Sequence, residues 1–147
     1  MEISYLCGAR QGDVLRLKLG DLREEGVFIR QGKTGKKQIK RWTPRLRAAV
    51  KLAEQQPSEI KSLYLLHNGK GAPYTSRALY QSWRKVKAGA RQRLNGELDF
   101  TFHDIKAKGI SDYEGDKQRF SGHKSASQVA VYDRKIEVVD SLDPDKK

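Results

Sequence analysis

The sequence contains a single cysteine, Cys7, and only three histidines among its 147 residues. One thiol cannot form an internal disulfide, so the chain depends on no disulfide framework and suits a reducing compartment. The cysteine and the scattered histidines also lack the spacing that zinc ligands show. We therefore expect no structural metal, no metal-dependent reaction and no cofactor.

Long apolar runs are absent as well. No segment approaches the roughly 20 consecutive apolar residues that cross a bilayer. The N-terminus lacks the basic, apolar and small-residue succession of a secretory signal. These absences predict a cytoplasmic protein that has no membrane partner.

Acidic residues are few relative to basic ones: 18 Asp and Glu stand against 30 Lys and Arg, which gives a net charge of +12. So strong a positive field attracts polyanions, above all nucleic acid. Hydrophobic residues make up 37% of the chain, which is lean but sufficient for a globular domain. The charge alone does not separate a DNA-binding protein from a basic RNA-associated or ribosome-associated one.

Hydrophobic periodicity and turn residues predict a mostly α-helical α+β fold, a helix bundle with a small antiparallel β-sheet. Two helical pieces, broken around Gly8, precede a hairpin whose turn lies at residues 32–35. Thr43 is expected to cap a helix that has proline at its first position. The other expected elements are a short strand at 63–66, a long helix at 75–93 with a basic face, and short helices at 103–113, 116–121 and 126–132. We find no repeat and no linker, so residues 1–147 are expected to form one domain.

Four separated segments hold the residues best suited to chemistry. Each is weak alone, because an arginine beside a turn or a lysine in a hairpin is usually solvated surface. In chain order they are Gly8–Leu15 with Arg10, Gly32–Lys36 with Lys33, Phe102–Lys106 with His103, and Ser121–Tyr132 with His123.

Together these segments resemble the tyrosine recombinases, or phage integrases. That family has an arginine in a G-x-R-x-x-E/D-x-L setting, a lysine in a β-hairpin turn, an H-x-x-R box, and an L-G-H element with a tyrosine nine residues after its histidine. Arg10 and Lys33 match the first two elements, and His103 opens the third. Tyr132 stands nine residues after His123, and this spacing is the most specific part of the resemblance.

The sequence departs from the family pattern in three ways. The third box reads H-x-x-K, with Lys106 in place of the second arginine. Lysine offers a point charge where arginine offers a planar, two-pronged donor, so the exchange is not neutral. The interval between His103 and His123 is a few residues shorter than usual, which predicts a trimmed helix. The N-terminal DNA-clamping domain and the first part of the catalytic domain are also expected to be absent, so that residues 1–147 form a truncated catalytic domain.

The resemblance implies site-specific recombination of double-stranded DNA, as in the integration or excision of a prophage or mobile element in a bacterial host. It implies that Tyr132 is the nucleophile and forms a 3′-phosphotyrosyl link without a metal ion. It also implies that the full-length enzyme works as a tetramer on DNA.

The remaining matched residues take supporting roles by the same resemblance. Arg10 and Lys106 would stabilise the charge that develops on the phosphate oxygens, with His123 as a further hydrogen-bond donor. His103 would act as the base or would orient the tyrosine. Lys33 would donate a proton to the leaving 5′-oxygen.

Alternative interpretations remain open. Tyr132 follows the apolar residues 129–131, so it also suits a core position on a short helix, for which Ser125 and Gln128 predict a capping box. Tyr113 competes for the role of nucleophile but lacks the spacing to a Gly-His element. The main functional alternative is a DNA-binding fragment that has lost strand cleavage, and a basic RNA-associated or ribosome-associated protein is a more distant one.

Overall fold

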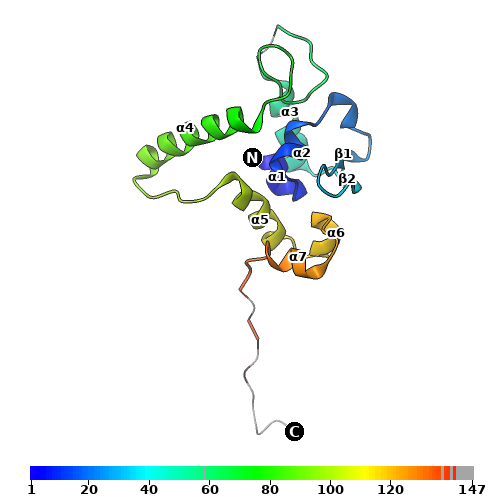
Figure 1. The fold of residues 1–147 in the computed structure, drawn as a ribbon, viewed down its shortest axis with the longest axis vertical. Helices are drawn as coiled ribbons and strands as arrows, with labels where there is room; N and C mark the ends of the chain where they lie inside the picture. The colour runs from blue at the N-terminus through cyan, green and yellow to red at the C-terminus, as the bar shows by residue number, and fades with distance from the viewer. Residues whose placement is uncertain (58, 137, 140, 142–147) are drawn as a thin grey trace.

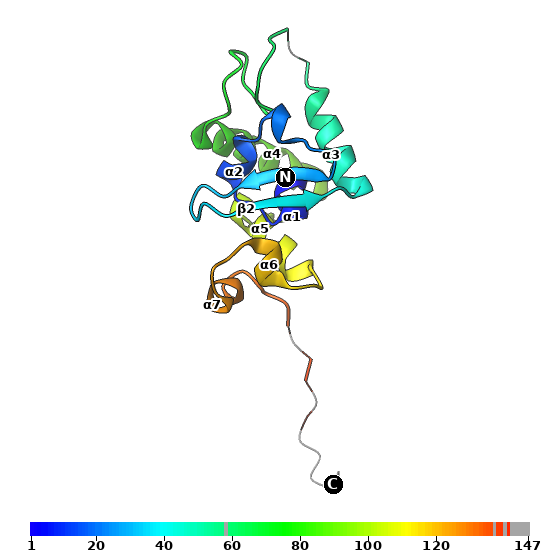
Figure 2. The ribbon, with the colours of Figure 1, turned by 90° about the vertical axis from the view of Figure 1, so that its right-hand side faces the viewer.

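The computed structural model describes residues 1–57, 59–136, 138, 139 and 141, which form a mostly helical fold with one two-stranded antiparallel sheet (Figures 1 and 2). The predicted fold class is therefore confirmed. In chain order the elements are α1 (Glu2–Cys7), α2 (Gln11–Leu15), the 3₁₀-helix η1 (Leu19–Asp21), β1 (Gly26–Arg30), β2 (Lys37–Arg41), α3 (Pro44–Glu54), α4 (Ser76–Leu94), α5 (Phe102–Asp112), α6 (Lys117–Ser121) and α7 (Ala126–Ala130).

The sheet is the predicted hairpin. β1 and β2 pair in antiparallel register along their whole length. Two backbone hydrogen bonds close the turn: Gln31 N donates to Lys36 O, and Gly35 N donates to Gln31 O, both at 2.8 Å. Val27 and Ile29 alternate along β1 and are buried, so the apolar face of β1 fixes the hairpin on the core.

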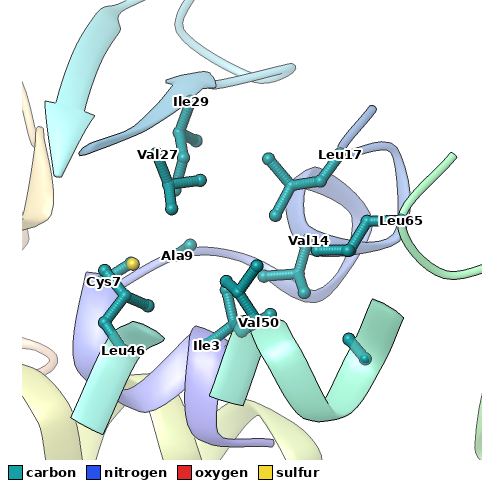
Figure 3. Packing of buried hydrophobic residues seen from close by; sticks show 11 residues of the cluster. Ile3, Cys7, Ala9, Val14, Leu17, Val27, Ile29, Leu46, Val50 and Leu65 are labelled. Atoms are coloured by element: carbon teal, nitrogen blue, oxygen red, sulfur yellow. The ribbon is translucent and has the colours of Figure 1, made fainter. Parts of the chain in front are cut away.

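The hydrophobic core lies where α1, α2, α3 and β1 meet (Figure 3). Val27 and Ile29 of β1 lie over the side chains that α1 and α3 contribute, as Figure 3 shows. Ala9, in the junction between α1 and α2, is also buried in this cluster. The core therefore holds the segment that carries Arg10 in a fixed position relative to the hairpin.

Gly109, which has no side chain, allows α5 to pack closely against the backbone of α1. A Cβ atom at this position would lie 2.2 Å from the backbone oxygen of Tyr5, so a larger residue would push the two helices apart. α5 carries His103 and Lys106, and α1 leads directly to Arg10. The glycine thus sets the spacing between two of the four segments.

α4 extends away from the rest of the fold (Figure 1). Trp83 is the buried residue of this helix, and its ring packs edge-on against Phe100 and Phe102, with centroid distances of 5.5 and 5.8 Å. These contacts attach α4 to the beginning of α5. None of the helices that the structure describes is both long enough and apolar enough to cross a membrane.

One predicted strand is wrong. Residues 63–66 form no strand, and Tyr64 instead makes an isolated antiparallel bridge with Lys18. Leu65 from this segment is buried, and its backbone N donates to the carbonyl of Leu17 at 2.9 Å. Leu65 is the one buried residue of this run, whereas Leu63 is 74% exposed, so the run neither joins a sheet nor is buried as a whole.

The last helix is shorter than predicted. It ends at Ala130, so Tyr132 lies in the turn that follows instead of within the helix. The predicted capping box of Ser125 and Gln128 does not form, because Gln128 Oε1 accepts a hydrogen bond from Lys124 N at 3.2 Å. Gln128 therefore binds the backbone N–H of Lys124, one residue before the N-cap Ser125, instead of closing the capping box.

Candidate functional site

The structure brings together the six residues that the sequence singles out. Ring contacts and one hydrogen bond join Tyr132, His103, His123 and Lys106. The two remaining cations, Arg10 and Lys33, lie within electrostatic range, since their charges contribute to lowering the pKa values of Lys106 and His123. In chain order the six are Arg10 between α1 and α2, Lys33 in the hairpin turn, His103 and Lys106 on α5, His123 after α6, and Tyr132 after α7.

α5 places His103 and Lys106 at different depths. Thr101 and Asp104 form a reciprocal capping box in which Asp104 N donates to Thr101 Oγ1 and Thr101 N donates to Asp104 Oδ2, which fixes where the helix begins. Because three positions separate His103 from Lys106, both lie on the same side of the helix. His103 is exposed, whereas Lys106 is only 1% exposed.

Lys106 is buried, and the opposite charge of Asp13 acts on it without forming an ion pair. Its Nζ lies 3.4 Å from His123 Nε2 and 4.7 Å from the centroid of the Tyr132 ring. In the part of the chain that the structure describes, no carboxylate forms an ion pair with it. Burial, and then the positive charge of Arg10, lowers the pKa of Lys106 to about 8. Because a buried ammonium that forms no ion pair is poorly stabilised, an anion that binds beside it is attracted strongly.

His123 follows the end of α6 at a glycine with left-handed backbone geometry. Gly122 has a φ of 69°, a conformation that glycine adopts without strain. The His123 ring is buried, and its Nδ1 lies 2.7 Å from Ser121 Oγ. Burial, and then the charge of Lys106, lowers the pKa of His123 to about 4, so the ring is neutral at pH 7.

The backbone around Tyr132 is tied to the turn after α7 and to α5. Tyr132 N donates to the carbonyl of Val129 at 2.8 Å, and Ser111 Oγ donates to the carbonyl of Tyr132 at 3.2 Å. The next residue, Asp133, forms an ion pair with Lys117 of α6 at 2.5 Å. These contacts place the tyrosine beside α5 although it lies outside any helix.

The ring of Tyr132 contacts both histidines. It stacks on the His123 ring, with centroids 4.7 Å apart and an interplanar angle of 24°. It also meets the His103 ring at 5.2 Å with a tilt of 52°. Burial, and then the charge of Lys106, lowers the pKa of His103, which leaves that ring neutral and able to accept a proton.

Gln31 links three of the four segments, and sequence reasoning missed it. Its Oε1 accepts from Arg10 Nη1 at 2.8 Å and from Thr34 Oγ1 at 2.9 Å, while its Nε2 donates to Ser121 O at 2.9 Å. The side chain is 4% exposed. A polar residue between a strand and a turn gives no sequence signal of this role, because its partners lie far away along the chain.

Two further hairpin side chains bind the same end of α6. Gln38 Nε2 donates to Arg119 O at 2.6 Å, and Lys40 Nζ donates to Phe120 O. Together with Gln31, they satisfy three consecutive carbonyls at a helix C-terminus, where intrahelical donors are missing. The sequence of β2, K-Q-I-K-R, has no alternation of polar and apolar residues that could have predicted this docked face.

Asp13, the acidic residue of the first motif, supports the hairpin turn. Asp13 is 5% exposed, and its Oδ1 accepts from Gly32 N at 2.9 Å and from Arg16 Nη2 at 3.1 Å. The turn is therefore held from the α2 side, while Lys33 at its tip remains exposed. The charge of Lys33 still contributes to lowering the pKa of His123, so the two groups lie within electrostatic reach.

Tyr113, the rival nucleophile, is engaged elsewhere. It follows α5 and stacks on Phe120, with ring centroids 4.1 Å apart and nearly parallel planes. No group of three or more His, Cys, Asp and Glu side chains within the described ranges is arranged to hold a metal ion. A groove of about 1110 Å³ lies between α1, α5 and residues 134–136, and its lining includes none of the six predicted residues.

Residues 1–137 match the model of the phage integrase family. The chain belongs to this family. It is 30% identical over 141 residues to the integrase of Escherichia phage HK022, an alignment that covers 90% of this chain and 39% of that protein. The chain therefore spans well under half the length of this curated relative. The family resemblance predicted from the four motifs is confirmed.

Solved structures with a similar fold include the lambda integrase catalytic core, with a TM-score of 0.65 and 18% identity over 83% of this chain and 76% of that one. A lambda integrase tetramer bound to a Holliday junction gives a TM-score of 0.70 at 17% identity, covering 95% and 43% of the two chains. The XerH site-specific recombinase, in a post-cleavage complex with its palindromic difH substrate, gives 0.65 at 21% identity, covering 89% and 40%. These similarities establish the fold.

Proposed function

We propose that residues 1–147 act as the catalytic domain of a site-specific recombinase that cuts and rejoins double-stranded DNA through a covalent bond between Tyr132 and a DNA 3′-phosphate. The observation that carries the proposal is the contact of the Tyr132 ring with a buried, unpaired lysine and two neutral histidines. Membership of the phage integrase family supports the same reaction class.

The cluster supplies the groups that phosphoryl transfer requires. Tyr132 Oη attacks the phosphorus while the bond between phosphorus and the 5′-oxygen breaks. The tyrosine proton passes to His103, whose lowered pKa keeps its ring able to accept it. Lys33, exposed at the tip of the hairpin, donates a proton to the leaving 5′-oxygen. The products are a 3′-phosphotyrosyl bond and a free 5′-hydroxyl, and attack by a 5′-hydroxyl reverses the step.

The developing negative charge on the phosphate is stabilised by Arg10 and Lys106. Gln31 binds one guanidinium nitrogen of Arg10 and leaves the other N–H groups of this fork for the phosphate. Lys106 is held in a site that excludes water, where a fixed charge acts most strongly. The phosphate would therefore lie between the α1–α2 junction and α5.

Double-stranded DNA is the partner that we propose, with integration or excision of a prophage or mobile element as the biological outcome. The net charge of +12 supports binding to a polyanion. We further propose that the full-length enzyme self-associates into a tetramer on DNA, as lambda integrase does on a Holliday junction.

The test uses a pool of duplexes that carry randomised core sequences and a single nick. The short strand released beyond the nick diffuses away, so the covalent state accumulates. We expect an SDS-resistant protein–DNA adduct that forms equally in EDTA, because no step needs a metal ion. DNA binding without an adduct across the pool would favour the alternative, a DNA-binding fragment that no longer cleaves.

A further inference from the structure

The hydrogen bonds of His123 define which of its ring nitrogens carries the proton. A charged lysine has three N–H donors and no acceptor, so Lys106 Nζ, 3.4 Å from His123 Nε2, must donate to that nitrogen. The proton of the neutral ring then lies on Nδ1, 2.7 Å from Ser121 Oγ. The Ser121 hydroxyl accepts it and turns its own hydrogen toward the carbonyl of Gln118 at 3.4 Å.

The hydrogen bond from Lys106 occupies the lone pair of His123 Nε2. His123 therefore presents no N–H group toward the space beside Lys106, where a phosphate would bind. We infer that His123 is a positioning residue, a hydrogen-bond acceptor that holds the Lys106 ammonium, and that Ser121 fixes it in the tautomer this requires. The inference rests on the proposed function, and it replaces the role of phosphate donor expected for this histidine from the family resemblance.

A lysine at position 106 needs such an anchor. Arginine presents a planar fork with fixed geometry, whereas a lysine ammonium ends a flexible four-carbon chain. His123 binds one of its three N–H groups, and the Tyr132 ring lies 4.7 Å from the ammonium. The two remaining N–H groups are left for a phosphate oxygen. Ser121 stands at the first position of the segment that matches the L-G-H element, so this serine and Lys106 bind the two nitrogens of one imidazole.

The surroundings of the ring agree with this assignment. Ser121 is fully buried, and within the described residues its hydroxyl forms hydrogen bonds only with the carbonyl of Gln118 and with His123 Nδ1. The carbonyl of Ser121 accepts a hydrogen bond from Gln31 Nε2, which fixes the backbone beside the imidazole. The imidazole is thus held at both nitrogens, by Ser121 two positions before it and by Lys106 of α5.

The first test is spectroscopic and needs no DNA. In ¹⁵N-edited spectra of the protein at pH 7, we expect His123 Nδ1 to give a pyrrole-type signal and Nε2 a pyridine-type signal. Lys106→Met removes the donor while keeping the apolar stem, and it should shift the ring partly or wholly to the Nε2–H tautomer. Ser4→Ala is the matched control, because it removes an equally buried hydroxyl that binds Ala9 O, and it should leave the His123 signals unchanged.

The second test is a double-mutant cycle in single-turnover cleavage. Lys106→Met should slow cleavage by about 100-fold or more, and His123→Ala should slow it by about tenfold or more. Because His123 acts through Lys106, the double variant should be no more than about threefold slower than Lys106→Met alone. An Nε2–H tautomer in the wild-type protein, unchanged signals in Lys106→Met, or multiplied effects in the double variant would each overturn the inference. If the wild-type protein forms no adduct, the proposed function fails while the tautomer test still decides the positioning claim.

Discussion

The ring of Tyr132 stacks on the ring of His123, although Tyr132 stands nine positions later in the chain and the whole of α7 lies between them. The two planes differ by 24°, and the Lys106 ammonium lies over the same tyrosine ring at 4.7 Å. This contact explains why the spacing in the sequence between His123 and Tyr132 is a specific sign of the site. α7 and its flanking turns span a fixed length, so the spacing determines whether the two rings meet.

Acid should destabilise the fold through His123. Its folded-state pKa of about 4 lies below the ordinary value of 6.5, so the unfolded chain binds more protons between these two values. The free energy of unfolding should fall by roughly 1–3 kcal/mol as the pH falls from 6.5 to 4. Urea unfolding at several pH values measures this slope. His123→Gln should remove most of this pH dependence of the free energy of unfolding. His103 should account for part of what remains, because its pKa is also lowered.

Gln31→Met should impair cleavage far more than folding or DNA affinity. Methionine keeps the length and bulk of the side chain but cannot bind Arg10, Thr34 and Ser121. Without these hydrogen bonds Arg10 is no longer held in place for the phosphate, so adduct formation should slow by about 100-fold. The Kd for DNA should stay within about twofold of wild type. Gln38→Met is the control, since it loses one hydrogen bond to the same helix end without touching Arg10. Equal rates in the two variants would refute the linking role of Gln31.

Gly109→Ala should destabilise the protein. The new methyl group would lie 2.2 Å from the carbonyl oxygen of Tyr5, and separating α1 from α5 should cost about 1–3 kcal/mol. Gly89→Ala, inside the exposed α4 with open space around the new atom, should instead stabilise by about 0.5–1 kcal/mol. Thermal or urea denaturation separates the two outcomes. Similar effects at both positions would show that the close helix crossing is not needed.

DNA affinity should depend steeply on salt. With a net charge of +12, binding releases condensed counter-ions, and the association constant should fall by about 100-fold or more between 50 and 200 mM salt. Arg84 and Lys85 on α4 are exposed, and neutralising both should lower the slope of log K against log salt. Fluorescence anisotropy with a labelled duplex measures this. A flat salt dependence would contradict DNA as the partner.

Local patterns were enough to predict the hairpin, the helix that begins after Thr43 and the four motif segments. Each depends on residues close together in the chain: β1 on the apolar run at 27–29, and α3 on a Thr-Pro pair whose hydroxyl accepts from Leu46 N. The family followed from the order and spacing of the motifs. The strand predicted at 63–66 was wrong because a short apolar run also fits a loop that buries a single residue, here Leu65.

The contacts that hold the site together could not be predicted from the sequence. Gln31 and Ser121 are ordinary polar residues whose partners lie up to 90 positions away, and burial gives them their roles. The same is true of Lys106, which pattern matching identified only as a cation. Its burial and its contact with His123 depend on how α5 packs against α6.

The identity of the nucleophile is tested most directly by mapping the covalent adduct. Protein trapped on a nicked duplex is digested and analysed by mass spectrometry, alongside a Tyr132→Phe variant that keeps the ring contacts but lacks the hydroxyl. We expect a nucleotide on the peptide that contains Tyr132, and no adduct with Tyr132→Phe despite unchanged folding and DNA affinity. Attachment at Tyr113, or an adduct that persists in Tyr132→Phe, would show that Tyr132 is not the nucleophile.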